Sequence, residues 1–384
     1  MKRKICVVVT ARPSYSRIKS ALKAIQLQPN LELQLVIAAS ALLDRYGEVV
    51  KVIEQDGFEI IEKVYMVLDG EKLVTSAKST GLGIIELATT FDNLKPDVVV
   101  TIADRFETMS TAIAASYMNI PLAHVQGGEV TGSIDEKVRH SITKLSDLHF
   151  VATQKAAERV IKMGEDPKAV FVTGCPSVDL ASSVLNNCNL DFDPIEKYGG
   201  VGEIKKLEGD YIVVLQHPVT TEHELARQHV VLTLRAIKDL GITTLWFWPN
   251  VDAGSDGTSK GIRSFREIEK PTNIQFFKNI IPEDFLKIIS NAKCIVGNSS
   301  VAVRECSFLG VPAINIGGRQ AGRERGGNVL DIEHNYNHII EAIKRQINNG
   351  RYPSDPLYGD GRAGQRIAEL LATEHLRIEK RLMY

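Results

Sequence analysis

Cysteine is scarce in this chain and forms no recognisable pattern. The 384 residues include five cysteines, an odd number, and no C-x-x-C pair occurs among them. A disulfide framework and a zinc-binding pattern are therefore both unsupported, and we expect no metal ligands. Scattered thiols of this kind are usually buried and unreactive in a reducing compartment, which indicates a cytoplasmic protein.

An excess of one charge and a long hydrophobic run are also lacking. Lysine and arginine number 46 and aspartate and glutamate 47, so the formal net charge is −1 and a nucleic-acid partner is not expected. The apolar run Ile5–Val9 is far shorter than the ~20 residues of a membrane span, so we expect no membrane partner and no leader segment. The length suits two globular domains.

Short apolar runs alternate with helix-like segments, in which apolar residues recur at spacings of three and four. Strands are predicted over Ile5–Val9, Leu33–Ala38, Asp97–Ile102, Pro121–Val125, His149–Ala152, Tyr211–Leu215, Thr243–Trp248, Ile274–Phe277, Cys294–Val296 and Ala313–Ile316. Helices are predicted over 15–27, Gly47–Gln55, Glu107–Met118, Lys137–Leu145 and Glu222–Leu240. This rhythm indicates crossover connections and parallel sheets, which is an α/β fold.

The alternation weakens between about Leu185 and Gly209, where turn-forming residues stand without periodicity. We therefore expect a first Rossmann-like domain over 1–185 and a second over 205–364. The final segment, 365–384, contains a charged amphipathic pattern over Gln365–Leu382. It predicts one helix that packs across both domains.

Polar residues follow the predicted strands, at the edge where parallel sheets bind their ligands. After the first strand, Arg12 and Ser16 stand at a helix start, which suits an anion, although simple capping of the helix explains the serine equally well. Neither G-x-G-x-x-G nor G-x-x-x-x-G-K-[ST] occurs, so a dinucleotide fingerprint and a P-loop are unsupported and no cofactor is expected.

Carboxylates follow the next two strands of the first half. Asp104 and Arg105 come after Asp97–Ile102, and the segment from Gln126 to Glu136 comes after Pro121–Val125. Within that segment, paired glycines allow a close backbone approach to a ligand. We expect four acidic side chains to converge there, with Arg139 one helical turn beyond the third, and such a cluster separates an acid from a base. The four are Asp104, Glu129, Asp135 and Glu136.

Anion-binding residue types follow the strands of the second half. His217 ends one strand, and Asn250 follows the next. The run Gly297–Ser300 then opens a helix whose backbone amides and hydroxyls, including those of Ser299 and Ser300, suit a phosphate. Glu305, one turn further on, suits paired ribose hydroxyls, and an arginine after the following strand, Arg319, suits a diphosphate.

Together these motifs resemble the UDP-N-acetylglucosamine 2-epimerase family, most closely its hydrolysing branch in sialic-acid and related nonulosonic-acid biosynthesis. The resemblance spans nearly the whole chain. It rests on Asp104-Arg105-Phe106, Gly127-Gly128-Glu129-Val130, Ile134-Asp135, Val138-Arg139-His140, Gln216-His217-Pro218, Gly297-Asn298-Ser299-Ser300, Arg304-Glu305 and Gly318-Arg319-Gln320. Each motif is weak alone, and the combination is specific.

The resemblance implies two Rossmann-like parallel-sheet domains around a central cleft, as in GT-B glycosyltransferases. It implies that UDP-GlcNAc loses its C2 proton and UDP by anti elimination to 2-acetamidoglucal, and that water then adds to give N-acetylmannosamine. Asp104, Glu129, Asp135 and His217 are then expected to be catalytic. Substrate contacts are expected from Arg12, Ser16, Arg105, Gln126, Arg139, Asn250, Ser299, Ser300, Glu305 and Arg319. A homo-oligomer, dimer or tetramer, is also expected.

One position departs from the family pattern. In some members the residue three before Glu129 is a catalytic glutamate, whereas here Gln126 cannot exchange a proton in that way. A UDP-2,4-diacetamido-6-deoxy sugar, as in the legionaminic-acid pathway, is therefore a second candidate substrate. The motifs are also compatible with a non-hydrolysing epimerase, a GT-B glycosyltransferase or a non-catalytic UDP-sugar sensor.

Overall fold

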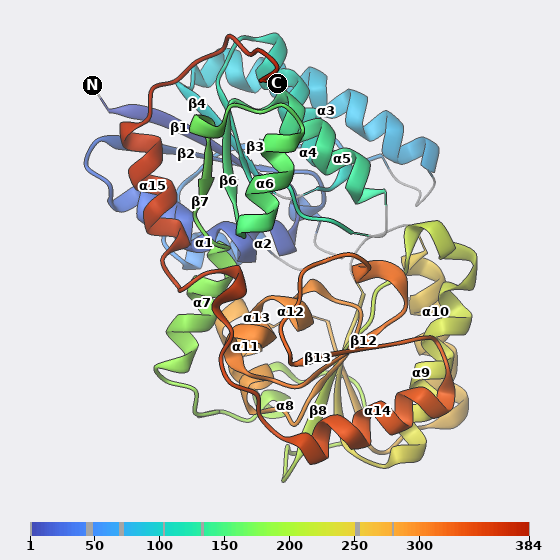
Figure 1. Cartoon of the computed structure of the whole chain (residues 1–384). Helices are drawn as coiled ribbons and strands as arrows, with labels where there is room; N and C mark the ends of the chain where they lie inside the picture. Colours follow the sequence, from blue (N-terminus) through green and yellow to red (C-terminus); the bar gives the residue numbers. More distant parts are fainter. Residues whose placement is uncertain are drawn as a thin grey trace. The chain divides into compact units, whose positions relative to one another are not determined.

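A computed structural model describes residues 2–43, 49–68, 73–102, 104–131, 134–249, 254–278 and 280–383. The chain divides into two compact units (Figure 1). The first unit comprises Met1–Glu129, Ile134–Asp179 and Tyr358–Tyr384, and the second comprises Val130–Ser133 and Leu180–Leu357. The chain passes between them inside helix α7 (Pro176–Leu185) and again at the short helix η6 (Pro356–Tyr358).

The first unit contains a parallel sheet of seven strands in the order β3-β2-β1-β4-β5-β6-β7. The strands are β1 (Arg3–Val9), β2 (Leu31–Ala38), β3 (Ile60–Val64), β4 (Val98–Ile102), β5 (Leu122–Val125), β6 (Leu148–Val151) and β7 (Val170–Val172). The helices are α1 (Arg12–Leu27), η1 (Ala39–Leu42), α2 (Val49–Gln55), α3 (Leu73–Leu94), α4 (Phe106–Tyr117), α5 (Asp135–Leu145), α6 (Gln154–Lys162), η3 (Pro167–Ala169) and α15 (Ala363–Thr373).

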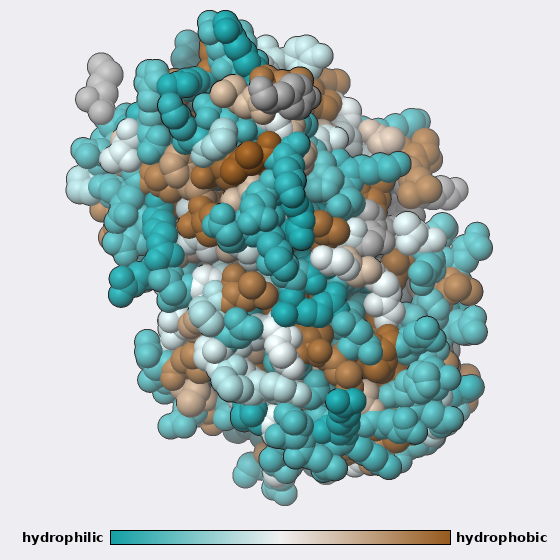
Figure 2. All heavy atoms as spheres, viewed as in Figure 1, coloured by the Kyte–Doolittle hydropathy of each residue, from teal (hydrophilic) through white to brown (hydrophobic). Residues whose placement is uncertain are grey.

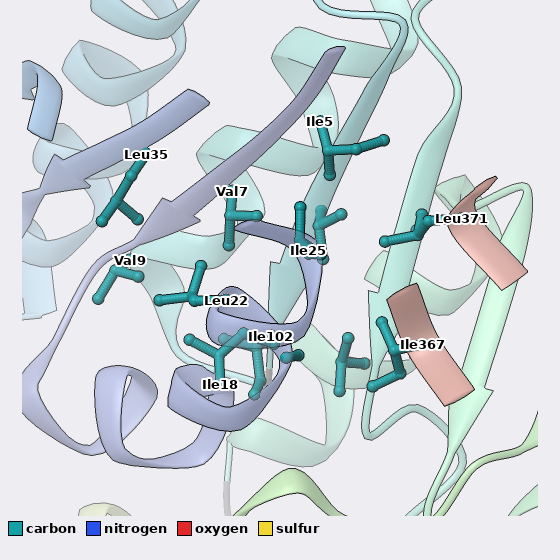
Figure 3. Packing of buried hydrophobic residues seen from close by; sticks show 14 of the residues in the cluster. Ile5, Val7, Val9, Ile18, Leu22, Ile25, Leu35, Ile102, Ile367 and Leu371 are labelled. Carbon is teal, nitrogen blue, oxygen red and sulfur yellow. The ribbon is translucent and has the colours of Figure 1, made fainter. Parts of the chain in front are cut away.

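Both faces of the first sheet are buried, because successive side chains of a strand point to opposite faces. On one face, Ile5, Val7 and Val9 of β1 belong to a cluster with residues of α1 and α15, among them Leu22 and Ile367 (Figure 3). On the other face, Cys6 and Val8 pack with residues of α3, α4 and α5. The continuous apolar run of β1 is the sequence signature of this two-sided burial.

The second unit contains a parallel sheet of six strands in the order β10-β9-β8-β11-β12-β13. The strands are β8 (Tyr211–Leu215), β9 (Thr243–Phe247), β10 (Ile274–Phe277), β11 (Ile295–Gly297), β12 (Ala313–Ile316) and β13 (Val329–Ile332). Helices α9 (Ala226–Leu240), α10 (Ser255–Glu269) and α14 (Tyr336–Asn349) cover one face, and α11 (Pro282–Asn291), α12 (Ser300–Val303) and α13 (Glu305–Leu309) cover the other (Figure 1). The short helices are α8 (Pro194–Tyr198), η4 (Thr220–Leu225) and η5 (Gly318–Gln320).

These two sheets confirm the predicted fold class of two parallel-sheet α/β domains. The segment 185–209, in which the predicted alternation weakens, contains α8 and belongs to the second unit, where side chains such as Phe192 and Leu207 pack against its core. Its turn-forming residues reflect an irregular but ordered backbone, held by Asp193, which accepts hydrogen bonds from Ile195 N and Leu207 N, each at 2.7 Å.

The final helix is shorter than predicted. It was expected over Gln365–Leu382, whereas α15 ends at Thr373 and, within the first unit, packs against α1. The chain beyond it lies extended because its polar groups find partners in that unit. Lys380 Nζ lies 2.6 Å from Glu165 Oε2, and Met383 N donates to Gly164 O at 3.0 Å.

Several elements lie outside the sequence predictions, namely β3, β7, β13, α3, α6, α7, α8, α10, α11 and α14. The long helix predicted from Glu222 is instead a short helix, η4, which has non-helical dihedral angles at Glu222, followed by α9. The start of the helix predicted from Gly47 lies outside the described residues, and α2 begins at Val49. None of the described helices is long and apolar enough to cross a membrane. On the face shown in Figure 2, hydrophobic side chains are scattered among hydrophilic ones.

Candidate active-site edges

Each sheet has one point at which its strand order reverses direction. In the first unit, β1 lies between β2 and β4, and in the second, β8 lies between β9 and β11. Loops leave such a pair of strands towards opposite faces of the sheet, so their carboxyl ends open a place for a ligand. The sequence-predicted residues follow these strands. Arg12 and Asp104 follow β1 and β4, and His217 and Ser299 follow β8 and β11.

A buried arginine gathers the polar groups at the first edge. Arg139, on α5, has only 1% of its side chain exposed and forms an ion pair with Asp104. Its Nη1 donates to Glu129 O at 2.8 Å and to Glu136 Oε2 at 3.0 Å. Burial alone acts to lower the pKa of Arg139, but the charges of Asp104, Glu129 and Glu136 raise it above its ordinary value. The guanidinium therefore stays charged and holds the loops after β4 and β5 together.

The glycine pair before Glu129 has a steric role. Gly128 has a positive φ of 73°, and a Cβ there would lie 2.3 Å from Ala156 O on α6. Only glycine allows this approach without a clash. Arg159, also on α6, donates to Gly128 O at 3.2 Å. The loop that carries Glu129 is thus held against α6.

Two further arginines follow strands β4 and β1 of the same sheet. Arg105 binds Glu107 with two nitrogens, at 3.1 Å for Nε to Oε2 and 3.0 Å for Nη2 to Oε1. Glu107 is almost fully buried, and sequence reasoning did not select it, because a glutamate in the first turn of a helix is ordinary. Burial lowers the pKa of Arg12, the first residue of α1, to about 10. Ser16 donates back to Arg12 O at 3.4 Å.

Gln126, at the departure from the family pattern, is buried with a positive φ of 69°. Its Nε2 lies 2.9 Å from the sulfur of Cys175, and that sulfur lies 3.0 Å from Ser177 Oγ. No spacing in the sequence indicates this contact, since Cys175 comes from the loop after β7. Asp135 is the first residue of α5 and is partly exposed, next to Glu136.

The second edge is organised by an asparagine. Asn298 follows β11, accepts from His217 N through Oδ1 at 2.7 Å and donates to His217 O through Nδ2 at 2.8 Å. Its own carbonyl accepts from Gln320 Nε2 at 2.9 Å and from Arg319 Nη1 at 3.3 Å. One buried residue, through its side chain and its backbone carbonyl, thus joins the ends of β8, β11 and β12. In the sequence analysis, Asn298 appears only as a member of the motif Gly297-Asn298-Ser299-Ser300 and is not predicted to have a role of its own.

Just before Asn298, the backbone of Gly297 lies very close to the backbone of β8. Gly297 has a φ of 138°, and a Cβ there would lie 2.1 Å from Leu215 O on β8. Ser299 then caps α12, accepting from Val301 N at 3.4 Å. Both Ser299 and Ser300 are buried. The turn therefore directs backbone amides and hydroxyls to the edge where β8 and β11 end.

Glu305 is the first residue of α13 and is only 6% exposed. Its Oε2 is buried and has no hydrogen-bond partner among the residues that the structure describes. A buried acceptor without a partner is costly, so such an atom is typical of a group that binds a donor from a ligand. The expected substrate contact Asn250 lies outside the described residues.

Comparison with known proteins decides the family. A sequence model of the UDP-N-acetylglucosamine 2-epimerase family matches residues 23–372, which is most of the chain. The chain belongs to this family. It is 30% identical over 373 residues to the UDP-N,N'-diacetylbacillosamine 2-epimerase (hydrolyzing) of Legionella pneumophila, covering 97% of this chain and 96% of that protein.

A second relative is equally similar. The UDP-N-acetylglucosamine 2-epimerase of Neisseria meningitidis serogroup B is 30% identical over 377 residues, covering 97% of this chain and 95% of that protein. Among solved structures, the UDP-GlcNAc 2-epimerase of Methanocaldococcus jannaschii in complex with UDP-GlcNAc and UDP aligns with a TM-score of 0.79 at 20% identity, covering 96% and 99% of the two chains. That likeness shows a shared fold.

Within each unit, some of the predicted site residues lie together at the carboxyl ends of neighbouring strands. In the first unit, Arg139 joins Asp104 to Glu136 and to the backbone of Glu129. In the second, Asn298 joins His217 to Arg319. Arg139 forms an ion pair with Glu136, three residues before it in the chain. The sequence pattern had instead placed Arg139 one helical turn beyond Asp135.

Proposed function

We propose that this 2-epimerase is hydrolysing and converts UDP-N-acetylglucosamine and water to N-acetylmannosamine and UDP. The observation that carries the proposal is the group of carboxylates around Arg139 at the first edge. A C2 proton is only weakly acidic, so its removal needs a carboxylate held in place and a stabilised leaving group. Asp104 is oriented by the buried Arg139 guanidinium, which supports a role as acid or base.

In the proposed reaction, a carboxylate takes the proton from C2 while the bond between C1 and the diphosphate oxygen breaks. The electron pair of the C2–H bond forms the C1–C2 double bond, and UDP leaves with the other pair. Water then adds its hydroxyl to C1 and a proton returns to C2 on the opposite face. Asp104, Glu129 and Asp135 are the candidate proton carriers, and Gln126 serves as a hydrogen-bonding residue.

The second edge is proposed to bind the nucleotide. Ser299, Ser300 and Arg319 would bind the diphosphate, because hydroxyls and a guanidinium are its usual partners. The unpartnered Oε2 of Glu305 supports a hydrogen bond from a ribose hydroxyl. His217 is proposed to contact the leaving diphosphate, and Arg12, Ser16 and Arg105 the sugar side of the substrate. A homo-oligomer, the predicted cytoplasmic location and the absence of a cofactor remain predictions.

A second substrate is supported by the name of a relative and by one residue of this chain. The Legionella protein is named for a UDP-diacetylbacillosamine substrate, and Gln126 departs from the glutamate of some family members. A UDP-2,4-diacetamido-6-deoxy sugar is therefore the second candidate. The two sugars differ at C4 and C6, away from the reacting C1 and C2.

One experiment separates these possibilities. The chain is incubated in deuterated water with each UDP-sugar, without added metal or nicotinamide, and products are followed by NMR. Release of UDP and N-acetylmannosamine with deuterium at C2 is expected from UDP-GlcNAc. Formation of UDP-ManNAc alone would mean a non-hydrolysing enzyme, and turnover of only the diacetamido sugar would select the second candidate. Sugar transfer without deuterium would indicate a glycosyltransferase, and binding without turnover a sensor.

A further inference from the structure

Three side chains of types that can ligate a metal ion gather in the second unit, and none of them is among the residues proposed to bind the nucleotide. Glu222 lies in η4, His229 in the first turn of α9, and His334 between β13 and α14. Their potential ligand atoms all lie within 4.8 Å of one another. Glu222 and His229 are near each other in the sequence, whereas His334 is brought beside them by the order of the strands.

His334 has an unsatisfied ring. Both its Nδ1 and its Nε2 are buried and have no hydrogen-bond partner in the part of the chain that the structure describes. Buried imidazoles normally bond through at least one nitrogen, so a ring with neither nitrogen bonded indicates a missing partner. Gly317 provides space for this ring, since a Cβ there would lie 2.5 Å from His334 Nε2.

The neighbours of His334 supply the rest of a ligand set. The rings of His229 and His334 are stacked, with centroids 3.7 Å apart and planes 6° from parallel. Glu222 Oε2 lies 4.0 Å from His229 Nδ1. The His229 side chain is 17% exposed and that of Glu222 is 43% exposed, so an ion in solution can reach the group.

We propose that Glu222, His229 and His334 form a binding site for a divalent transition metal of the zinc class. Two imidazoles and one carboxylate are a ligand set that Zn²⁺ accepts, with water as the fourth ligand, whereas Mg²⁺ and Ca²⁺ prefer oxygen ligands alone. Ligands about 2.0–2.2 Å from a tetrahedral ion lie roughly 3.3 Å from one another, so binding requires the three groups to move inward. The two stacked imidazoles must also tilt away from parallel, because each nitrogen binds an ion in the plane of its ring.

The site would act as a structural clamp. Glu222 interrupts the helical path between β8 and α9, and η4 begins soon after His217. A metal bound to all three side chains would join η4 and α9 to the segment after β13. It would restrain the chain that follows His217 without taking part in proton transfer. This inference is independent of the proposed function, because its test measures metal binding and not turnover.

The test uses the untagged chain in a Cys188→Ser background, because Cys188 is an exposed thiol that can bind metals by itself. After treatment with a chelator, the protein is titrated with ZnCl₂ in a calorimeter and with CoCl₂ under visible spectroscopy, since Co²⁺ reports its geometry and Zn²⁺ is silent. One saturable site is expected, with the Co²⁺ absorption of four-coordinate geometry and displacement of Co²⁺ by Zn²⁺. Bound Zn²⁺ should also raise Tm.

Single substitutions identify the ligands. His334→Gln and His229→Gln should each weaken Zn²⁺ binding more than about tenfold, since even the loss of a residue that only orients a ligand costs 10–100-fold. His338→Gln is the matched control, because His338 is exposed on α14 outside the cluster, and it should leave the affinity unchanged. Thermal melting in the presence of a chelator shows whether His334→Gln folds. If it does not fold, Glu222→Gln, which changes the exposed ligand, is used in its place. Absence of a saturable site, or equal loss in His338→Gln, would overturn the proposal.

Discussion

The carboxyl edge of the first sheet and that of the second sheet satisfy their polar groups in different ways. At the first edge, charges meet one another: the buried Arg139 binds the carboxylate of Asp104, and the partly buried Arg105 binds that of Glu107. At the second edge, the neutral amide of Asn298 binds backbone groups of His217, and the carboxylate of Glu305 keeps an oxygen that has no partner among the described residues.

This difference matters for what each edge can do. An ion pair within the protein holds a carboxylate in one orientation, which suits a group that must accept a proton from one defined atom of a substrate. Amide-to-backbone bonds instead shape a turn and leave hydroxyls and amides for an incoming anion. The proposed function therefore assigns chemistry to the first edge and nucleotide binding to the second, and substitutions at each edge test that assignment.

The largest effect is expected from Asp104→Asn. Loss of a positioned acid or base costs about 10²–10⁴-fold in rate, so kcat should fall by that factor while the affinity for UDP is retained. The measurements are steady-state kinetics and calorimetric titration of UDP. Asp92→Asn, which makes the same change at an exposed position on α3, should alter neither. If Asp104→Asn loses UDP binding as severely as an arginine variant of the second edge does, the two roles are assigned wrongly.

Gly297→Ala should destabilise the second unit. A Cβ 2.1 Å from Leu215 O cannot be accommodated without moving β11 or β8, so we expect a loss of more than about 3 kcal/mol in the free energy of unfolding. Gly209→Ala is the control, because Gly209 also has a positive φ but a Cβ there meets nothing within 4 Å. That variant should lose only roughly 1–2 kcal/mol. If urea denaturation gave the same loss of unfolding free energy for both variants, the close contact between Gly297 and β8 would not matter for stability.

Glu305→Ala and Arg319→Ala should weaken UDP binding. A hydrogen bond to a charged group contributes roughly 1.5–3 kcal/mol, so the Kd for UDP should rise about ten- to a hundredfold in each variant. Calorimetric titration of UDP measures this directly. Arg345→Ala, on the exposed face of α14, is the control for a lost positive charge and should bind UDP normally. An unchanged Kd in both edge variants would contradict nucleotide binding at the second edge.

The smallest effect concerns acid stability of the first unit. Glu165 is buried, and although burial alone would raise its pKa, hydrogen bonds from His149, Lys144 and Lys380 lower it to about 2. A carboxylate with a lowered folded pKa stabilises the fold above its unfolded pKa, near 4.5, and this stabilisation is lost as the pH falls towards 2. Burial lowers the pKa of His149, so its protonation on unfolding adds to the loss below about pH 6.5.

Thermal melting between pH 7 and pH 3 checks this prediction. Glu165→Gln should lower Tm at pH 7, and the gap to the parent chain should narrow as the pH falls. Glu379→Gln, on the exposed part of the same terminal segment, should melt like the parent chain at every pH. A gap that is constant with pH would mean that the Glu165 contacts do not titrate as described.

Much of the fold and part of the site could be predicted from local pattern. Strands such as β1 and β4 are continuous apolar runs because both faces of a parallel sheet are buried. β3 escaped prediction because three of its five residues, Ile61, Glu62 and Lys63, are exposed at the edge of the sheet. The position of functional residues after strands was also predictable, since a parallel sheet places all its strand ends on one edge.

Local sequence pattern is thus enough for the α/β class, the two parallel sheets and the strand-end positions of Asp104, His217 and Ser299, because burial and backbone geometry are imposed within short segments. Which of these residues meet depends on the fold of the whole chain. Arg139 reaches Asp104, Gln126 reaches Cys175, and His229 stacks on His334 because strand order, and not sequence spacing, sets those neighbours. Contacts between residues far apart in the chain depend on how crossover connections order the sheet, and no local periodicity encodes that order.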